Sequence, residues 1–143
     1  NSAMSFRFLQ ALDELFAPGS QCDQAYYLCQ GEFNYTQAPG TSLAPVQSVT
    51  SVSGDLWICE AALFVHWFTV GSMEAQSAAQ LCVVDADAMA RCQKKHRIID
   101  AITSAYAVGY HARTIAAAPP NSEWPTDLCV PFTEYCEMVT SMS

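Results

Sequence analysis

A chain of 143 residues has the length of one ordinary domain, and its 51% hydrophobic against 14% charged residues exclude intrinsic disorder of the whole chain. The 14 acidic and 6 basic residues give a formal net charge of -8, so the chain as a whole repels nucleic acid and anionic membrane surfaces. We therefore expect a single domain over residues 1–143 that buries a large core and binds neither DNA nor RNA.

The first half of the chain predicts two amphipathic helices and a loop. Apolar residues between positions 6 and 16 recur at three- and four-residue steps, the period of a helix, until Pro18 ends the pattern. A second apolar stripe runs over 22–29, and Gly31 follows it as a helix stop. Residues 32–53 are rich in Ser, Thr, Gly and Pro, so we predict a long irregular loop there.

The second half predicts further helices. Segment 56–70 is apolar on nearly every side, as expected for the central helix of a bundle, and it is shorter than the roughly 20 apolar residues of a membrane span. No proline interrupts 72–118, which we predict as one short helix and one long helix capped by Asp85 or Asp87. A last helix is expected near 132–139. The predicted fold is thus all-α, a disulfide-stapled antiparallel bundle of about five to six helices.

The seven cysteines are the basis for predicting disulfides. Cys22 and Cys29 lie seven positions apart, as do Cys129 and Cys136, so each pair would occupy one stripe of a helix. Seven residues rise about 10.5 Å along a helix, too far for a bond within a pair. We therefore predict bonds between Cys22 and Cys136 and between Cys29 and Cys129, joining two antiparallel helices. The remaining disulfide candidates, one of them left unpaired, are Cys59, Cys82 and Cys92.

Two further patterns concern the compartment. The nine-residue gap between Cys82 and Cys92 resembles half of the twin CX9C helical hairpin of small mitochondrial intermembrane-space proteins, over eleven residues and without a second such motif. Asn34 begins an Asn-Tyr-Thr sequence, an N-glycosylation acceptor. Together with the high cysteine count these patterns predict an oxidising compartment: secretion first, with the intermembrane space or another organelle lumen as alternatives.

A basic island stands out in this acidic chain. It consists of Arg91, Lys94, Lys95 and Arg97. The island is a candidate contact for an acidic partner or a lipid headgroup, and the alternative is a solvated helix face with internal ion pairs at three- and four-residue spacing. Cys92 and His96 also stand four residues apart, but two further ligands are lacking, so no metal site is predicted.

The sequence contains no HExxH, GxSxG, GxGxxG, P-loop or CxxC motif, so we expect neither enzymatic activity nor a cofactor. The first functional hypothesis is a non-enzymatic structural or protein-interaction module: an accessory subunit of a larger assembly or an extracellular binding domain. Its partners would be proteins, with membrane contact only through a partner complex. The alternative is a carrier of a small apolar ligand or pigment in a helical-bundle cavity. The aromatic residues available to line that cavity are Trp57, Phe64, Trp67, Phe68, Tyr106 and Tyr110.

Overall fold

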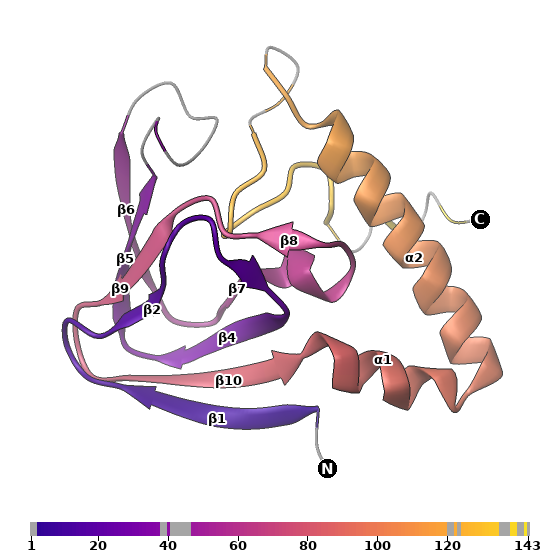
Figure 1. Ribbon diagram of the computed structural model, residues 1–143, viewed down its shortest axis with the longest axis horizontal. Helices are drawn as coiled ribbons and strands as arrows, with labels where there is room; N and C mark the ends of the chain where they lie inside the picture. The colour runs from indigo at the N-terminus through magenta and orange to yellow at the C-terminus, as the bar shows by residue number, and fades with distance from the viewer. Residues whose placement is uncertain are drawn as a thin grey trace.

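The computed structural model of the chain describes residues 3–37, 40, 47–119, 122, 124–134, 138, 139 and 142. Ten strands come first and two helices follow (Figure 1). The strands are β1 (Met4–Leu9), β2 (Glu14–Phe16), β3 (Gln21–Cys22), β4 (Gln24–Gln30), β5 (Glu32–Gln37), β6 (Ser48–Ser53), β7 (Leu56–Ile58), β8 (Trp67–Phe68), β9 (Ser72–Ala75) and β10 (Ala79–Asp85). The helices are a 3-10 turn η1 (Glu60–Leu63), α1 (Ala86–Lys94) and α2 (Arg97–Ala116). The predicted all-α bundle is therefore wrong.

The strands form a β-roll. One antiparallel four-stranded sheet has the order β1-β10-β4-β7, a second has the order β2-β9-β5-β6, and β3 pairs with β8 in a two-stranded ribbon. Both larger sheets contribute to one core, because Leu28 and Leu81 of the first and Phe33 and Met73 of the second are all fully buried. Large apolar side chains from two sheets thus supply the burial that stabilises the roll.

Four segments that the sequence predicts as helices are strands or turns instead. They are 6–16 (β1 and β2), 22–29 (β3 and β4), 56–70 (β7, η1 and β8) and 72–82 (β9 and β10). Local backbone geometry breaks two of them: Leu12 has a φ of 75° between β1 and β2, and Cys59 has a φ of 58° just before η1. Left-handed residues of this kind end a helix rather than continue it.

The predicted irregular loop at 32–53 contains a hairpin. Strands β5 and β6 pair antiparallel, with Phe33 opposite Val52 and Tyr35 opposite Thr50. The side chains of Phe33 and Tyr35 are buried in the core while Asn34 between them is only half-buried, as expected of a strand with one face inward. The sequence predicted a loop here because the composition of β6 is rich in Ser and Thr.

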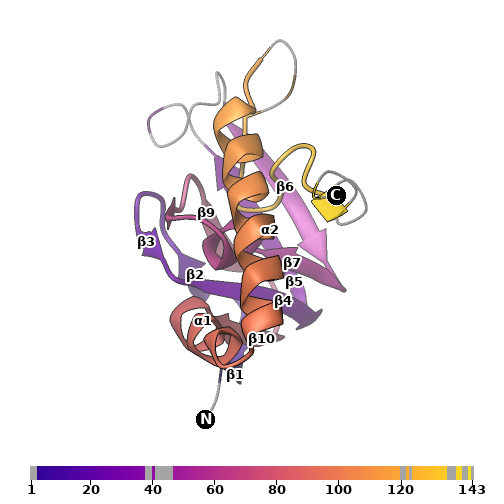
Figure 2. The ribbon, with the colours of Figure 1, turned by 90° about the vertical axis from the view of Figure 1, so that its right-hand side faces the viewer.

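The helical prediction for the region after β10 is confirmed in part. Asp85 caps α1, its side chain accepting a hydrogen bond from the Ala88 amide at 2.8 Å. The long predicted helix is broken near Lys95 and His96 into α1 and α2, and α2 runs along the side of the roll that Figure 2 faces. Within the described part of the chain, neither helix is long and apolar enough to cross a membrane.

The predicted disulfide staples are wrong. Free thiols are found at Cys22, Cys29, Cys59, Cys82 and Cys92. Cys22 and Cys29 lie on strands, so the helical stripe on which the prediction rested does not exist, and Cys136 lies outside the described residues. Cys82 and Cys92 lie on β10 and α1, which is not a helical hairpin. The inference of an oxidising compartment rested on disulfides and falls with them.

Candidate functional site

Two features lie where the roll contacts the elements that follow it in the chain: a buried carboxylate and a cavity. Residues 124–134, which we call the return segment, run from the end of α2 back to the roll (Figure 1). A turn presents Asp127: the Thr126 hydroxyl accepts hydrogen bonds from the amides of Leu128 and Cys129, both at 3.1 Å. The Cys59 amide then donates to the Asp127 carbonyl oxygen at 2.7 Å, which joins the return segment to the start of η1.

The side chain of Asp127 is inserted into the roll and is only 2% exposed. Its Oδ2 accepts hydrogen bonds from Tyr35 Oη at 2.7 Å and from the backbone amides of Val70 and Gly71, each at 3.1 Å. Its Oδ1 accepts one from Trp67 Nε1 at 2.7 Å. We call these four donors, together with the space that they enclose, the carboxylate cradle.

The cradle holds a buried carboxylate to which no cationic group of the described residues donates a hydrogen bond. Burial raises the pKa of Asp127, and the hydrogen bonds from Tyr35, Trp67 and the two amides act in the opposite direction. Burial, and next the negative charge of Asp127, raise the pKa of Tyr35, so the phenol stays protonated and donates. Among the described residues the donors to this carboxylate are neutral groups: the four donors of the cradle and, at the longer distance of 3.9 Å, the Cys59 thiol.

Close packing makes glycine necessary at one position of the cradle. A Cβ added to Gly71 would lie 2.6 Å from the Thr36 carbonyl oxygen and 2.7 Å from Cζ of Tyr35. Both distances are far inside van der Waals contact, so a side chain at this position would displace the phenol ring that donates to Asp127.

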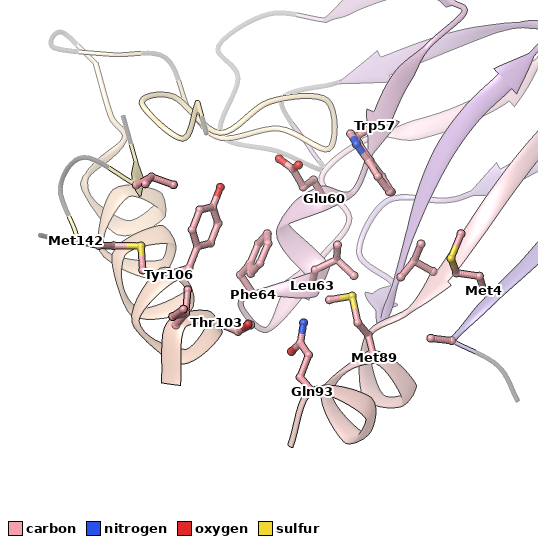
Figure 3. Close-up of a pocket in the computed structure, with 14 residues that line it drawn as sticks. Met4, Trp57, Glu60, Leu63, Phe64, Met89, Gln93, Thr103, Tyr106 and Met142 are labelled. Carbon is pink, nitrogen blue, oxygen red and sulfur yellow. The ribbon is translucent and has the colours of Figure 1, made fainter. Parts of the chain in front are cut away.

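The second feature is a cavity of about 850 Å³ between the roll and the helices, which we call the junction pocket (Figure 3). One wall comes from β7 and η1 and includes Trp57, Glu60 and Phe64; the facing wall comes from α1 and α2 and includes Met89 and Tyr106. The Phe64 and Tyr106 ring centroids are 4.9 Å apart, so aromatic contact holds η1 against α2 at the edge of the pocket.

Glu60 is the charged residue of this pocket. It is half-buried, and burial raises the pKa of its carboxyl. A neighbouring cavity of about 380 Å³, lined by return-segment residues such as Leu128 and Val130, also reaches Glu60. In Figure 3 the carboxyl group of Glu60 points away from Phe64. Glu60 therefore lies where the roll, α2 and the return segment meet.

The residues proposed from sequence lie elsewhere. The basic island is exposed at the end of α1 and the start of α2 and is not part of an enclosed site. Its contact with an acidic partner stays a prediction. Asn34 lies on β5 between Ser51 and Glu74, and its glycosylation is untested. No group of three side chains suited to a metal ion occurs in the described ranges.

Sequence reasoning missed Asp127 altogether. The aspartate follows Pro125 and Thr126 in what reads as a connection, and its partners Tyr35 and Trp67 lie 92 and 60 positions away in sequence. No local pattern signals such a contact. Trp57, Phe64 and Tyr106 were predicted to line a cavity and do line one, but its walls are a β-roll and two helices rather than a helical bundle.

Comparison with known proteins places the fold. No family model matches the chain, and no curated protein matches it. Among solved structures 345 chains match. The N-terminal domain of a transcriptional regulator from Streptomyces coelicolor has a TM-score of 0.62 at 19% identity over 79% of this chain and 77% of that one. A cyclic nucleotide-binding domain from Methylobacillus flagellatus has a TM-score of 0.59 at 15% identity over 78% and 63%. The catabolite activator protein of Thermus thermophilus has a TM-score of 0.56 at 12% identity over 78% and 51%.

These neighbours overturn the functions predicted from sequence. The predicted extracellular binding domain depended on an oxidising compartment and the predicted carrier on a cavity inside a helical bundle, whereas the neighbours include a transcriptional regulator domain and a cyclic nucleotide-binding domain. The likeness, at identities of 12 to 19%, is one of architecture. The chain has the fold found in cyclic nucleotide-binding domains.

Proposed function

We propose that the chain is a non-enzymatic regulatory domain that senses a small ligand in the junction pocket and passes its presence on to α2. One observation carries the proposal: the pocket takes one wall from the roll and the other from α1 and α2. A ligand that contacts both walls binds best when they are in one relative position, so its binding shifts the population of α2 positions. The occurrence of a similar fold in a transcriptional regulator domain and in a cyclic nucleotide-binding domain supports this proposal.

The lining favours a ligand of nucleoside type. Trp57, Phe64 and Tyr106 offer aromatic faces for a planar ring system, and the Glu60 carboxylate accepts hydrogen bonds from hydroxyl or amino groups. Purine nucleosides and their cyclic monophosphates carry both kinds of group. The described lining contains no cationic side chain, and Glu60 repels a phosphate. We therefore expect the nucleoside part to supply most of the affinity.

Isothermal titration calorimetry with adenosine, guanosine, cAMP and cGMP tests the proposal. Wild type is expected to bind at least one of the four, with the neutral nucleoside bound as tightly as its cyclic monophosphate or more tightly. Glu60→Gln keeps the shape of the side chain and removes its charge, and it is expected to weaken binding about 10-fold or more, because hydrogen bonds to a charged acceptor are the strong ones.

Two controls accompany that experiment. Glu32→Gln, at an exposed position of β5, is expected to leave binding unchanged. The ligand recovered after long incubation is expected to be chemically unchanged, and its turnover would contradict a non-enzymatic domain. No binding of any of the four compounds would contradict a nucleoside site in the junction pocket. Equal loss of affinity in the Glu60 and Glu32 variants would contradict it as well.

The regulated target is proposed to be a protein. Several large apolar side chains of α2 are exposed to solvent, Ile98 at 75%, Val108 at 71% and Ile115 at 69%. Apolar surface of this extent is typical of a helix that another protein element covers. Direct binding to nucleic acid is not part of the proposal, because the net charge of -8 opposes it.

A further inference from the structure

We propose that Asp127 is a ligand tethered to its own chain, whose carboxylate occupies an oxyanion-binding site of the β-roll that a free carboxylate can also occupy. The site is the carboxylate cradle, and the inference does not depend on what binds in the junction pocket. It gives the domain a built-in competitor that a small oxyanion can displace.

The donors of the cradle belong to the roll alone. Tyr35 comes from β5, Trp67 from β8, and the amides of Val70 and Gly71 from the link between β8 and β9. Two successive backbone amides that point at one oxygen form a concave anion-binding site, and the indole and phenol complete it. Only the acceptor comes from the return segment. Removing that acceptor therefore leaves four donors without a partner but still positioned by the roll.

The tether explains why neutral donors are enough to hold this anion. Asp127 is held close by the Cys59 amide, which donates to its carbonyl oxygen at 2.7 Å, and by Val130, which is only 3% exposed. A tethered group acts at an effective concentration in the millimolar range, so it does not need the affinity of a free ligand. Burial of the carboxylate, which raises the pKa of Asp127, opposes its insertion into the cradle as an anion.

Withdrawal of Asp127 and movement of α2 are mechanically linked. The return segment follows α2 after a short connection, and the Arg113 guanidinium of α2 donates to the carbonyl oxygen of Phe132. Tyr110 of α2 is 1% exposed and contacts Phe64 with ring centroids 4.8 Å apart. An oxyanion that replaces Asp127 in the cradle therefore frees the segment attached to the helix proposed to carry the signal.

Chemical rescue of Asp127→Ala tests the inference. The variant keeps every donor and lacks the carboxylate. Its melting temperature is followed with sodium formate, sodium acetate or sodium phosphate, with sodium chloride making up a constant ionic strength. We expect formate or acetate at tens of millimolar to raise the melting temperature of the variant by about 3 °C or more over chloride alone. Rescue by phosphate as well as by formate would mark a general oxyanion site and also support the proposal.

Asp13→Ala is the matched control. The Asp13 side chain also accepts a hydrogen bond from a backbone amide, that of Gln10 at 2.8 Å, but at an exposed position. It is expected to show no rescue. Equal responses of the Asp127 and Asp13 variants to formate and chloride, an adventitious ion effect only, would overturn the proposal.

A measurement on wild type keeps the inference testable if Asp127→Ala does not fold. Amide hydrogen exchange over 124–134 is compared in formate and in chloride at equal ionic strength. Because formate competes with Asp127, exchange in this segment is expected to be at least twofold faster in formate, while exchange over β10 stays constant. Exchange that is independent of formate in the return segment would refute a displaceable tethered ligand.

Discussion

Asp127 and Glu60 are two acidic residues at the contact between the roll and the elements that follow it, and their surroundings differ in kind. Asp127 is buried and accepts hydrogen bonds from the four cradle donors and, at a longer distance, from the Cys59 thiol, whereas Glu60 is half-buried and lines the junction pocket. Burial raises the pKa of both carboxyls, but only at Asp127 do hydrogen bonds oppose that shift. A carboxylate whose oxygens accept hydrogen bonds within the protein stabilises the fold, and a carboxylate that lines a cavity can accept hydrogen bonds from a ligand.

The largest loss of stability is expected at Gly71, where the cradle is packed most closely. Gly71→Ala puts a Cβ 2.6 Å from the Thr36 carbonyl oxygen and 2.7 Å from the Tyr35 ring, so it should destabilise the fold by about 3 kcal/mol. Gly40→Ala is the matched control, because its Cβ meets nothing within 4 Å. Urea unfolding measures both variants, and equal midpoints would show that the cradle is loosely packed.

Amide substitutions should act with opposite sign at the two acids. Asp127→Asn sets an NH2 group against N–H donors and should cost about 2 kcal/mol at pH 7. Glu60→Gln removes a half-buried charge and should stabilise the fold by less than about 1 kcal/mol.

The sign of the Glu60 effect follows from its pKa, which is raised on folding. Such a group contributes stability that is fully present below its unfolded pKa, about 4.3, and is lost as pH rises through the folded value. The advantage of Glu60→Gln over wild type should therefore be present at pH 7 and vanish below pH about 4. Chemical unfolding at a series of pH values measures this, and an advantage that grows toward acid pH would contradict the assignment.

Removing one donor from the cradle should cost less than disturbing the carboxylate. Tyr35→Phe keeps the ring and deletes the hydroxyl that donates to Asp127 at 2.7 Å, so we expect a loss of about 1.5 kcal/mol. Tyr27→Phe is its counterpart on the surface, where the hydroxyl donates to Asp55 at 3.4 Å, and it should cost less than about 0.5 kcal/mol. Urea midpoints that are the same for the two variants would mean that the cradle contributes nothing to stability.

The smallest change concerns the thiols. Cys59 is 1% exposed, and the hydrogen bond that its thiol donates to Cys22, together with burial, raises its pKa, so it should resist alkylation. Cys29 and Cys92 are exposed and should react first. Asp127→Asn loosens the return segment and should speed alkylation of Cys59 alone, as followed by peptide mass spectrometry. Rapid labelling of Cys59 in wild type would show that the segment does not cover it.

Several features of the chain were predictable from local pattern because their causes are local. Asp85 caps α1 through an amide three residues away, and the uninterrupted stretch after it is helical over most of its length. The strands were not predictable in this way. Residues four apart lie on one face of a helix and also on one face of a strand, so the spacing of Ala79 and Val83, both buried on β10, fits both. In strands of two to seven residues the periods cannot be told apart.

The sequence by itself determined that the chain buries a large apolar core, that a helix begins after Asp85, and that catalytic motifs are lacking. The tertiary structure decided the rest. Segment 56–70 is apolar on nearly every side because many of its residues pack against the sheets, α2 or the return segment, rather than because a helix lies at the centre of a bundle. The cradle joins groups 56 to 92 positions apart, and a contact over that distance leaves no periodicity in the chain from which it could be predicted.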